Sequence, residues 1–165
     1  MSKKSFLPAL LFGAMLAFAP GCGDADPCKD VECGANGTCF EGTCVCDVGY
    51  ETGVSGLCDT ESRVKFYGNF NVSEVCTPGG AGTYASIISS NSDISKINIS
   101  NFGDSGLNIT ASVEGSTITI SSQSITVGGT TFNVSGSGSI SGTTITLNYG
   151  ATGGATFTCV ATMTR

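Results

Sequence analysis

The sequence contains no histidine and no tryptophan, and charged residues make up only 12% of its 165 positions. Histidine is the commonest general base in enzymes and the commonest metal ligand in proteins, so its absence weighs against both roles. The chain also lacks a phosphate-binding loop, an HExxH metal motif and a GxSxG nucleophile motif. We therefore expect a protein that is not an enzyme and that holds no cofactor.

Positive charge is scarce as well. Seven Lys and Arg residues oppose 13 Asp and Glu residues, which gives a formal net charge of −6. The acids are concentrated between Asp24 and Glu61, a stretch in which Lys29 is the only base. Because the sequence has no basic patch, we expect no nucleic acid partner and no electrostatic attraction to anionic lipid.

Beyond residue 62 the sequence has only four acidic residues, and they are widely spaced: Glu74, Asp93, Asp104 and Glu114. Each falls at a predicted strand end or turn, where a carboxylate is normally solvated. A secreted hydrolase that uses a carboxylate pair would need two of them to converge in one pocket. We regard such a hydrolase as the least favoured alternative.

The first 21 residues have the pattern of an export signal. Lys3 and Lys4 supply positive charge, and an uncharged apolar run follows from Phe6 to Ala19. A helix of about 14 residues spans roughly 21 Å, which is less than the ~30 Å hydrocarbon core of a bilayer. The run therefore predicts a signal peptide over residues 1–21 rather than a permanent membrane span.

The run ends in Ala19-Pro20-Gly21-Cys22, which resembles the lipobox of bacterial lipoproteins. A small residue precedes the cysteine, as in that family, but Ala19 stands where the family usually has Leu, and Pro20 is unusual. The resemblance implies cleavage before Cys22 and its acylation, which anchors a protein firmly once two or three acyl chains are attached. The alternative is ordinary signal peptidase cleavage after Gly21, which would leave Cys22 as a free thiol.

Six cysteines follow at the spacing C-x4-C-x5-C-x4-C-x-C-x11-C, with Gly, Asn and Asp frequent between them. Such a short segment cannot bury a core of useful size, so disulfides must hold it, at roughly 2–4 kcal/mol each. Disulfides in turn require an oxidising compartment. Six cysteines allow many different pairings, and their spacing alone does not choose among them.

The stretch Cys44-Val45-Cys46-Asp47-Val48-Gly49-Tyr50 matches the C-x-C-x-x-G-aromatic signature of EGF-like domains, which residues 28–59 resemble. This resemblance implies the disulfides Cys28–Cys39, Cys33–Cys44 and Cys46–Cys58.

Calcium-binding members of the EGF-like family carry acids just before the first cysteine, where this chain has Asp24 and Asp26. However, Pro27 replaces the usual Glu or Gln, and the Asn or Asp expected after the third cysteine is missing. Calcium needs six or more oxygen ligands. We therefore predict no metal site, with calcium as the open alternative.

Residues 62–165 alternate apolar residues with Ser, Thr and Asn, the period-two pattern of antiparallel strands with one wet face. Glycine-rich turn signals separate the alternating runs. The pattern predicts nine strands, over residues 63–73, 83–89, 94–101, 107–113, 116–121, 124–127, 130–140, 143–149 and 155–163. Short links predict a meander of hairpins, which loses its free edges by closing into a barrel; a two-sheet sandwich is the alternative.

Two features bear on closure of this domain. The segment Lys65-Phe66-Tyr67-Gly68-Asn69-Phe70 ahead of such a meander is similar to small lipocalin-like barrels. Cys76 follows the first predicted strand and Cys159 lies in the last, and a disulfide between them would contribute about 4–5 kcal/mol through chain entropy. Two free thiols are the alternative. Pairing these eight cysteines leaves Cys22 as the odd one, which favours its acylation.

Together these patterns predict an all-β, lipid-anchored protein at the outer membrane or cell surface of a Gram-negative-type bacterium. An acidic tether, residues 22–27, would lead to the EGF-like module, which would act as a stalk for the β-domain. Our leading hypothesis is a non-catalytic binding, adhesion or structural module whose partner is an unidentified extracellular protein or glycan. The alternative is a carrier of a small apolar ligand, with a cavity lined by residues such as Phe66, Phe70, Phe132, Tyr149 and Phe157.

Overall fold

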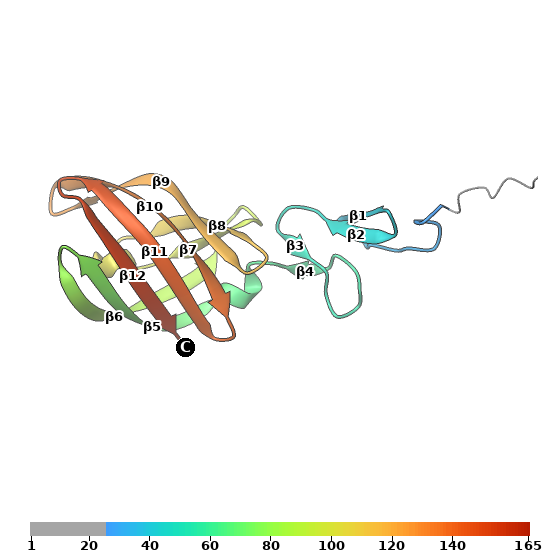
Figure 1. Ribbon diagram of the computed structural model, residues 1–165, viewed down its shortest axis with the longest axis horizontal. Helices are drawn as coiled ribbons and strands as arrows, with labels where there is room; N and C mark the ends of the chain where they lie inside the picture. Colours follow the sequence, from blue (N-terminus) through green and yellow to red (C-terminus); the bar gives the residue numbers. More distant parts are fainter. Residues whose placement is uncertain (1–25) are drawn as a thin grey trace, which may run out of the picture.

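A computed structural model of the chain describes residues 26–165. The predicted signal peptide, Cys22 and most of the acidic tether lie outside the described residues. Within them, a disulfide-rich module of residues 26–61 precedes a closed antiparallel β-barrel (Figure 1). The predicted all-β fold is therefore confirmed, and the meander closes into a barrel rather than splitting into two sheets. No helix between residues 26 and 165 combines the length and the apolar character that a membrane crossing requires.

The disulfide-rich module contains two small antiparallel sheets. They pair β1 (Gly37–Phe40) with β2 (Thr43–Cys46), and β3 (Tyr50–Glu51) with β4 (Thr60–Glu61). Its three disulfides are Cys28–Cys39, Cys33–Cys44 and Cys46–Cys58, the same pairs that the EGF-like resemblance implies. The buried apolar residues of the module are only two of these cysteines, so cross-links replace a core of aliphatic side chains.

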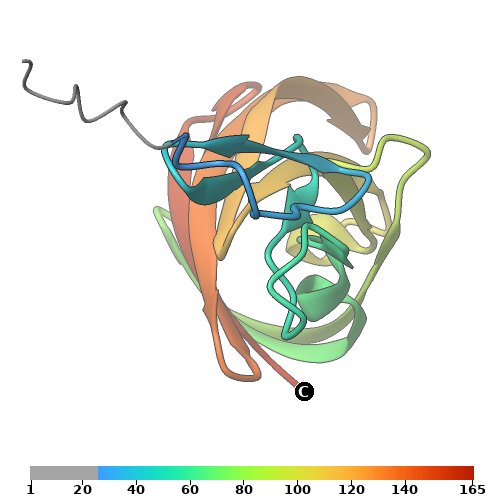
Figure 2. The ribbon, with the colours of Figure 1, turned by 90° about the vertical axis from the view of Figure 1, so that its right-hand side faces the viewer.

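Eight strands form the barrel. They are β5 (Gly68–Thr77), β6 (Gly80–Ser90), β7 (Lys96–Ile99), β8 (Ile109–Glu114), β9 (Thr117–Val127), β10 (Thr130–Ser141), β11 (Thr144–Gly153) and β12 (Phe157–Thr164). Each strand pairs antiparallel with the next along the chain, and β12 returns to pair with β5. Two short 3-10 helices complete the domain: η1 (Val64–Phe66) precedes β5, and η2 (Phe102–Asp104) lies between β7 and β8. Figure 2 shows the ring of strands from the side of the module.

The half of the barrel nearest the module is filled by side chains. Phe66 from η1 and Phe70 from β5 are 0% and 2% exposed, and they pack with inward-facing aliphatic residues from the other strands. The guanidinium of Arg165 lies 5.5 Å from the centre of the Phe70 ring, and its Nη2 donates to the Lys65 carbonyl at 3.0 Å. The first and last residues of the domain thus meet at this end, which is closed.

Several predicted strand boundaries differ from those of the structure. The predicted strands 116–121 and 124–127 are one continuous strand, β9, so the barrel has eight strands and not nine. The pairing of β9 with β10 shifts register between Val134 and Gly136, where β9 contains one extra residue. This bulge reverses the parity of the inward-facing residues, which are Ile118 and Ile120 before it and Ile125 after it. The first strand also begins at Gly68 rather than at residue 63, because residues 64–66 form η1.

Charged groups fasten the module to the barrel through the linker between them. One Nη of Arg63 donates to the carbonyls of Asn91 (2.6 Å) and Asp93 (3.0 Å) in the β6–β7 loop, and its Nε pairs with Glu61 at 2.9 Å. The ammonium group of Lys65 lies 2.6 Å from a carboxylate oxygen of Glu51. Because Arg63 is mostly buried, its contacts constrain the linker more than an exposed ion pair would.

Gly49 of the module packs close to Ile94 in the β6–β7 loop. It has a positive φ of 91°, and a Cβ atom built on it would lie only 2.7 Å from Cγ2 of Ile94. Its carbonyl accepts a hydrogen bond from the backbone N–H of Ser62 at 2.9 Å. A side chain at residue 49 would therefore push the module away from the barrel.

We predict that Gly49→Ala loosens the module from the barrel. The matched control is Gly56→Ala, because Gly56 also has a positive φ, of 84°, but a Cβ there meets no atom within 4 Å. Overpacking costs roughly 1–3 kcal/mol, so trypsin should cut the linker after Arg63 or Lys65 about tenfold faster in Gly49→Ala than in the control. Equal cleavage rates in the two variants would show that this contact does not hold the module in place.

Candidate ligand-binding site

A cavity of about 350 Å³ lies at the end of the barrel away from the module. The β5–β6 turn, η2 and the far ends of the strands surround it, and its walls are mainly apolar. The larger wall residues are Phe102, Ile125, Phe132, Val134, Tyr149 and Phe157. The rings of Phe132 and Phe157 are 6.0 Å apart and tilted by 59°. A cavity of this size and character is typical of a small-molecule site.

Incomplete strand pairing opens the barrel on this side. β6 pairs with β7 only through Ile88, Ser89 and Ser90, and β8 pairs with β9 only through Ser112 to Glu114. The segment that carries η2 covers the resulting gap instead of a full-length strand. The side chain of Gln123 bonds both the N–H (3.1 Å) and the carbonyl (2.8 Å) of Thr110, which satisfies backbone groups that a longer strand would have paired.

Glu74 places a carboxylate in the floor of the cavity. It lies on β5 in phase with Phe70 and Val72, so its side chain enters the barrel, and it is only 8% exposed. Its Oε1 accepts hydrogen bonds from the hydroxyl groups of Tyr84 (2.9 Å) and Tyr149 (2.7 Å). These two bonds offset part of the cost of burying a charged group.

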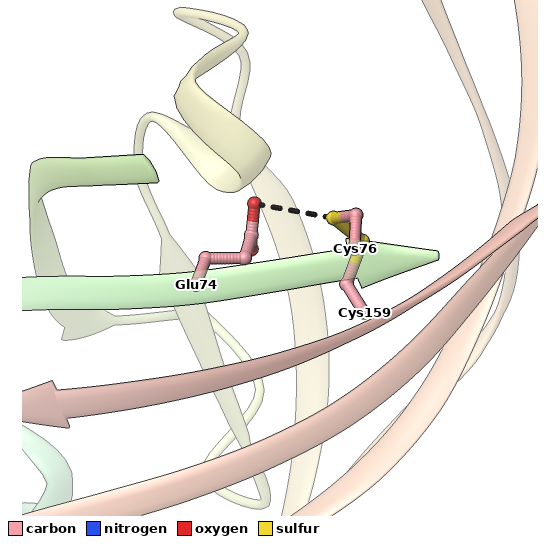
Figure 3. Close-up of side chains that lie close together, drawn as sticks. All are labelled: Glu74, Cys76 and Cys159. Atoms are coloured by element: carbon pink, nitrogen blue, oxygen red, sulfur yellow. Dashed lines mark hydrogen bonds between the residues drawn. A yellow bond between two sulfur atoms is a disulfide. The ribbon is translucent and has the colours of Figure 1, made fainter. Parts of the chain in front are cut away.

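The second oxygen of Glu74 faces a disulfide. Figure 3 shows Glu74 beside Cys76 and Cys159, with Oε2 3.7 Å from Sγ of Cys76. Cys76 and Cys159 are bonded to each other, so the sulfur carries no hydrogen and donates nothing to the carboxylate. Between residues 26 and 165, Glu74, Cys76 and Cys159 form the one cluster with ligand atoms close enough to hold a metal ion. Because its sulfurs are not thiolates, the cluster retains a single carboxylate and is a poor metal centre.

The environment of Glu74 raises the pKa of both tyrosines. Burial is the main cause for Tyr84 and for Tyr149, because ionisation would place a charge in a region of low dielectric. The negative charge of Glu74 and the hydrogen bonds to its carboxylate raise the pKa of each hydroxyl further. Both hydroxyls therefore remain hydrogen-bond donors at neutral pH.

The absence of a side chain at Gly136 on the neighbouring strand β10 leaves room for Tyr149. Gly136 on β10 lies opposite it, and a Cβ there would come within 2.6 Å of the Tyr149 Cβ. Phe102 of η2 packs on the Tyr149 ring with a centroid distance of 4.4 Å. The backbone N–H of Gly103 donates to the Tyr84 hydroxyl at 3.2 Å. The 3-10 helix and β10 together hold the two tyrosines against Glu74.

The structure divides the five aromatic residues that were predicted to line a carrier cavity. Phe132, Tyr149 and Phe157 do line the cavity, whereas Phe66 and Phe70 belong to the filled half of the barrel. The alternation of apolar residues could not separate the two groups, because inward-facing residues are apolar in both halves.

Cys76 and Cys159 form the disulfide that was preferred over two free thiols, and it lies at the cavity floor.

The prediction that all four acids of the β-domain are solvated is wrong for Glu74. A strand ending at residue 73 placed it in a turn, but β5 continues to Thr77. The sequence signal that identifies it is the alternation Phe70, Val72, Glu74, Cys76, which places a carboxylate on the apolar parity.

The other three acids are held outside the barrel core. Asp93 pairs with Lys96 at 2.8 Å, and hydrogen bonds from Lys96 and Ser95 hold the pKa of Asp93 well below its ordinary value. Glu114 is exposed at the end of β8 nearest the module, and Asp104 is exposed at the cavity rim. Glu74 and Asp104 thus line the same cavity, one at its floor and the other at its rim.

Of the two acids just before the first cysteine, the structure describes Asp26. The Oδ1 atom of Asp26 accepts a hydrogen bond from the backbone N–H of Cys28 at 2.9 Å, which is an Asx-type turn. Asp24 and Cys22 lie outside the described residues.

No protein-family model matches the chain, and no curated protein and no solved structure matches it.

We predict that replacing Glu74 changes the alkaline behaviour of the barrel. Because the folded barrel keeps Tyr84 and Tyr149 protonated, while an unfolded chain releases these protons near pH 10, stability is intact below about pH 10 and falls above it. Glu74→Gln removes one cause of the raised pKa values, so both tyrosines should ionise at lower pH. Tyrosinate absorbance during a pH titration measures this.

The variants Tyr84→Phe and Tyr149→Phe assign each step of that titration. Burial also raises the pKa of Tyr67, so all the proteins carry Tyr67→Phe as a common background. Identical titration curves with and without the Glu74 carboxylate would contradict its electrostatic influence on the two tyrosines.

Proposed function

We propose that this chain is an exported cell-envelope protein whose barrel binds a small apolar ligand without catalysing a reaction. The observation that carries the proposal is the apolar cavity at the end of the barrel away from the module. Of the functions considered from the sequence, the ligand carrier is the one that requires such a cavity. A purely adhesive or structural module would need no hollow in its core.

We further propose that Cys22 is acylated and that residues 28–59 form an EGF-like stalk. The disulfide pairing first to third, second to fourth and fifth to sixth supports the EGF-like assignment. The four disulfides between residues 26 and 165 pair eight of the nine cysteines with one another, which leaves Cys22 available for acylation. The protein would then sit on the outer membrane or cell surface with the barrel presented away from the anchor.

The hydrolase alternative has one observation in its favour, the presence of two acids at one cavity. Glu74, however, is held by two tyrosine hydroxyls, and Asp104 is an exposed rim residue with Asn101 as its hydrogen-bond partner. A carboxylate-pair mechanism needs both groups on opposite sides of one scissile bond. The geometry favours ligand binding over hydrolysis.

We predict that a bulky residue in the cavity mouth abolishes binding of an apolar probe. Ile125→Trp fills the mouth from β9, and Val160→Trp is the control, since Val160 points outward from β12. The neutral dye N-phenyl-1-naphthylamine should fluoresce more strongly on binding the wild type and the control. Affinity for the dye should fall by about tenfold or more in Ile125→Trp. Equal dye binding by both variants would place the dye elsewhere and contradict the proposed function.

We predict that the mature protein begins at an acylated Cys22. Intact mass spectrometry of protein extracted from membranes should show a chain from residue 22 with the added mass of its acyl chains. Cys22→Ser should move the protein to the soluble fraction, because a protein without acyl chains has no anchor. A mature chain that starts at Cys22 without added mass would contradict the anchor while leaving the proposed ligand site intact.

A further inference from the structure

The polar groups at the cavity floor point to a ligand class, an inference that rests on the binding function proposed above. We infer that the cavity recognises an apolar molecule that carries an ammonium group, which donates a hydrogen bond to Oε2 of Glu74. The apolar part of this molecule would contact Phe132, Phe157 and Ile125 in the cavity wall.

The two carboxylate oxygens of Glu74 differ in their hydrogen bonds. Oε1 of Glu74 accepts two hydrogen bonds, from Tyr84 and Tyr149. Among residues 26–165, no N–H or O–H group donates to Oε2, and Sγ of the disulfide-bonded Cys76 lies 3.7 Å from it. Glu74 is only 8% exposed, so a ligand donor that bonds Oε2 does so in surroundings of low dielectric, where a charge-assisted hydrogen bond is strong. The floor of the cavity thus presents Oε2 as a hydrogen-bond acceptor.

The charged side chains that line the cavity are negative. None of the three salt bridges between residues 26 and 165 involves Glu74. Among the residues that line the cavity, the charged ones are Glu74 and Asp104, and neither Lys nor Arg lines it. Two negative charges near apolar walls favour a cation and disfavour an anion, because the low dielectric strengthens both effects.

The ligand atoms at the cavity floor suit an organic cation better than a metal ion. Calcium needs six or more oxygen ligands, and here one carboxylate oxygen is free while both tyrosine hydroxyls donate to the other. Zinc prefers thiolate or imidazole, and the nearby sulfurs belong to the Cys76–Cys159 disulfide. An ammonium group needs only a few acceptors and can bring an apolar chain to fill the remaining volume.

The test compares three probes that share a ten-carbon chain: decylamine, decanol and decanoate. Each competes with N-phenyl-1-naphthylamine for the full chain at neutral pH, where the amine is protonated and the acid ionised. For the wild type we expect decylamine to bind at least about tenfold more tightly than decanol, and decanoate to bind most weakly. For Glu74→Gln the preference for the amine should disappear while decanol binding persists.

A control variant separates a local contact from net charge. Glu114→Gln removes the same charge at the opposite end of the barrel, on an exposed side chain outside the cavity. It should retain the preference for decylamine. If Glu74→Gln fails to fold, Glu74→Asp keeps the charge and withdraws the oxygens by one methylene. Decylamine should then lose about tenfold in affinity and decanol much less.

Failure of ammonium recognition and failure of the ligand-binding function would give different results. The inference is wrong if the three probes bind the wild type equally, or if Glu74→Gln keeps the preference for the amine. In either case the cavity binds apolar ligands, but Glu74 does not recognise the ammonium group. Tighter binding of decanoate would also overturn the inference. If none of the probes displaces the dye, the proposed ligand-binding function fails with it.

Discussion

The barrel depends on the pairing of its first strand with its last. β5 and β12 run antiparallel in continuous register from Asn71 and Thr164 to Thr77 and Thr158. The disulfide between Cys76 and Cys159 locks this register and joins residues 83 positions apart, a constraint worth about 4–5 kcal/mol in the chain-entropy model. Because a strand slip of one residue would turn every side chain to the other face, this link also decides that Glu74 points inward.

The two halves of the barrel differ in how completely side chains fill them. The half near the module is filled by aromatic and aliphatic side chains, whose burial stabilises the fold. The far half contains a cavity and a buried carboxylate, both of which cost stability. Tyr84 and Tyr149 reduce that cost, and η2 holds both in place. The well-packed half of the barrel thus offsets the cost of the cavity and of the Glu74 carboxylate at its floor.

The sequence predicted the class of fold, but it offered a cavity only as an alternative and did not place it at one end of the barrel. Period-two alternation identifies strands, and glycine-rich turns separate them, so an antiparallel meander could be expected. The change of parity between Ile120 and Ile125 was interpreted as a strand break, although a bulge in β9 produces the same pattern. Alternation also cannot show that β7 and β8 are too short to cover β6 and β9 fully, since that depends on pairing between strands. The cavity follows from that shortfall.

The module and the cavity lie at opposite ends of the barrel. At the near end, η1, Arg165 and the linker contacts of Arg63 close the barrel, and the module lies beyond them (Figure 1). The cavity opens at the other end, among the β5–β6 turn and η2. Figure 1 shows the start of the described chain on the side of the module away from the barrel, so the proposed anchor at Cys22 would hold the module end of the barrel toward the membrane. A ligand would then reach Glu74 from the side that faces away from the anchor, without displacing the module.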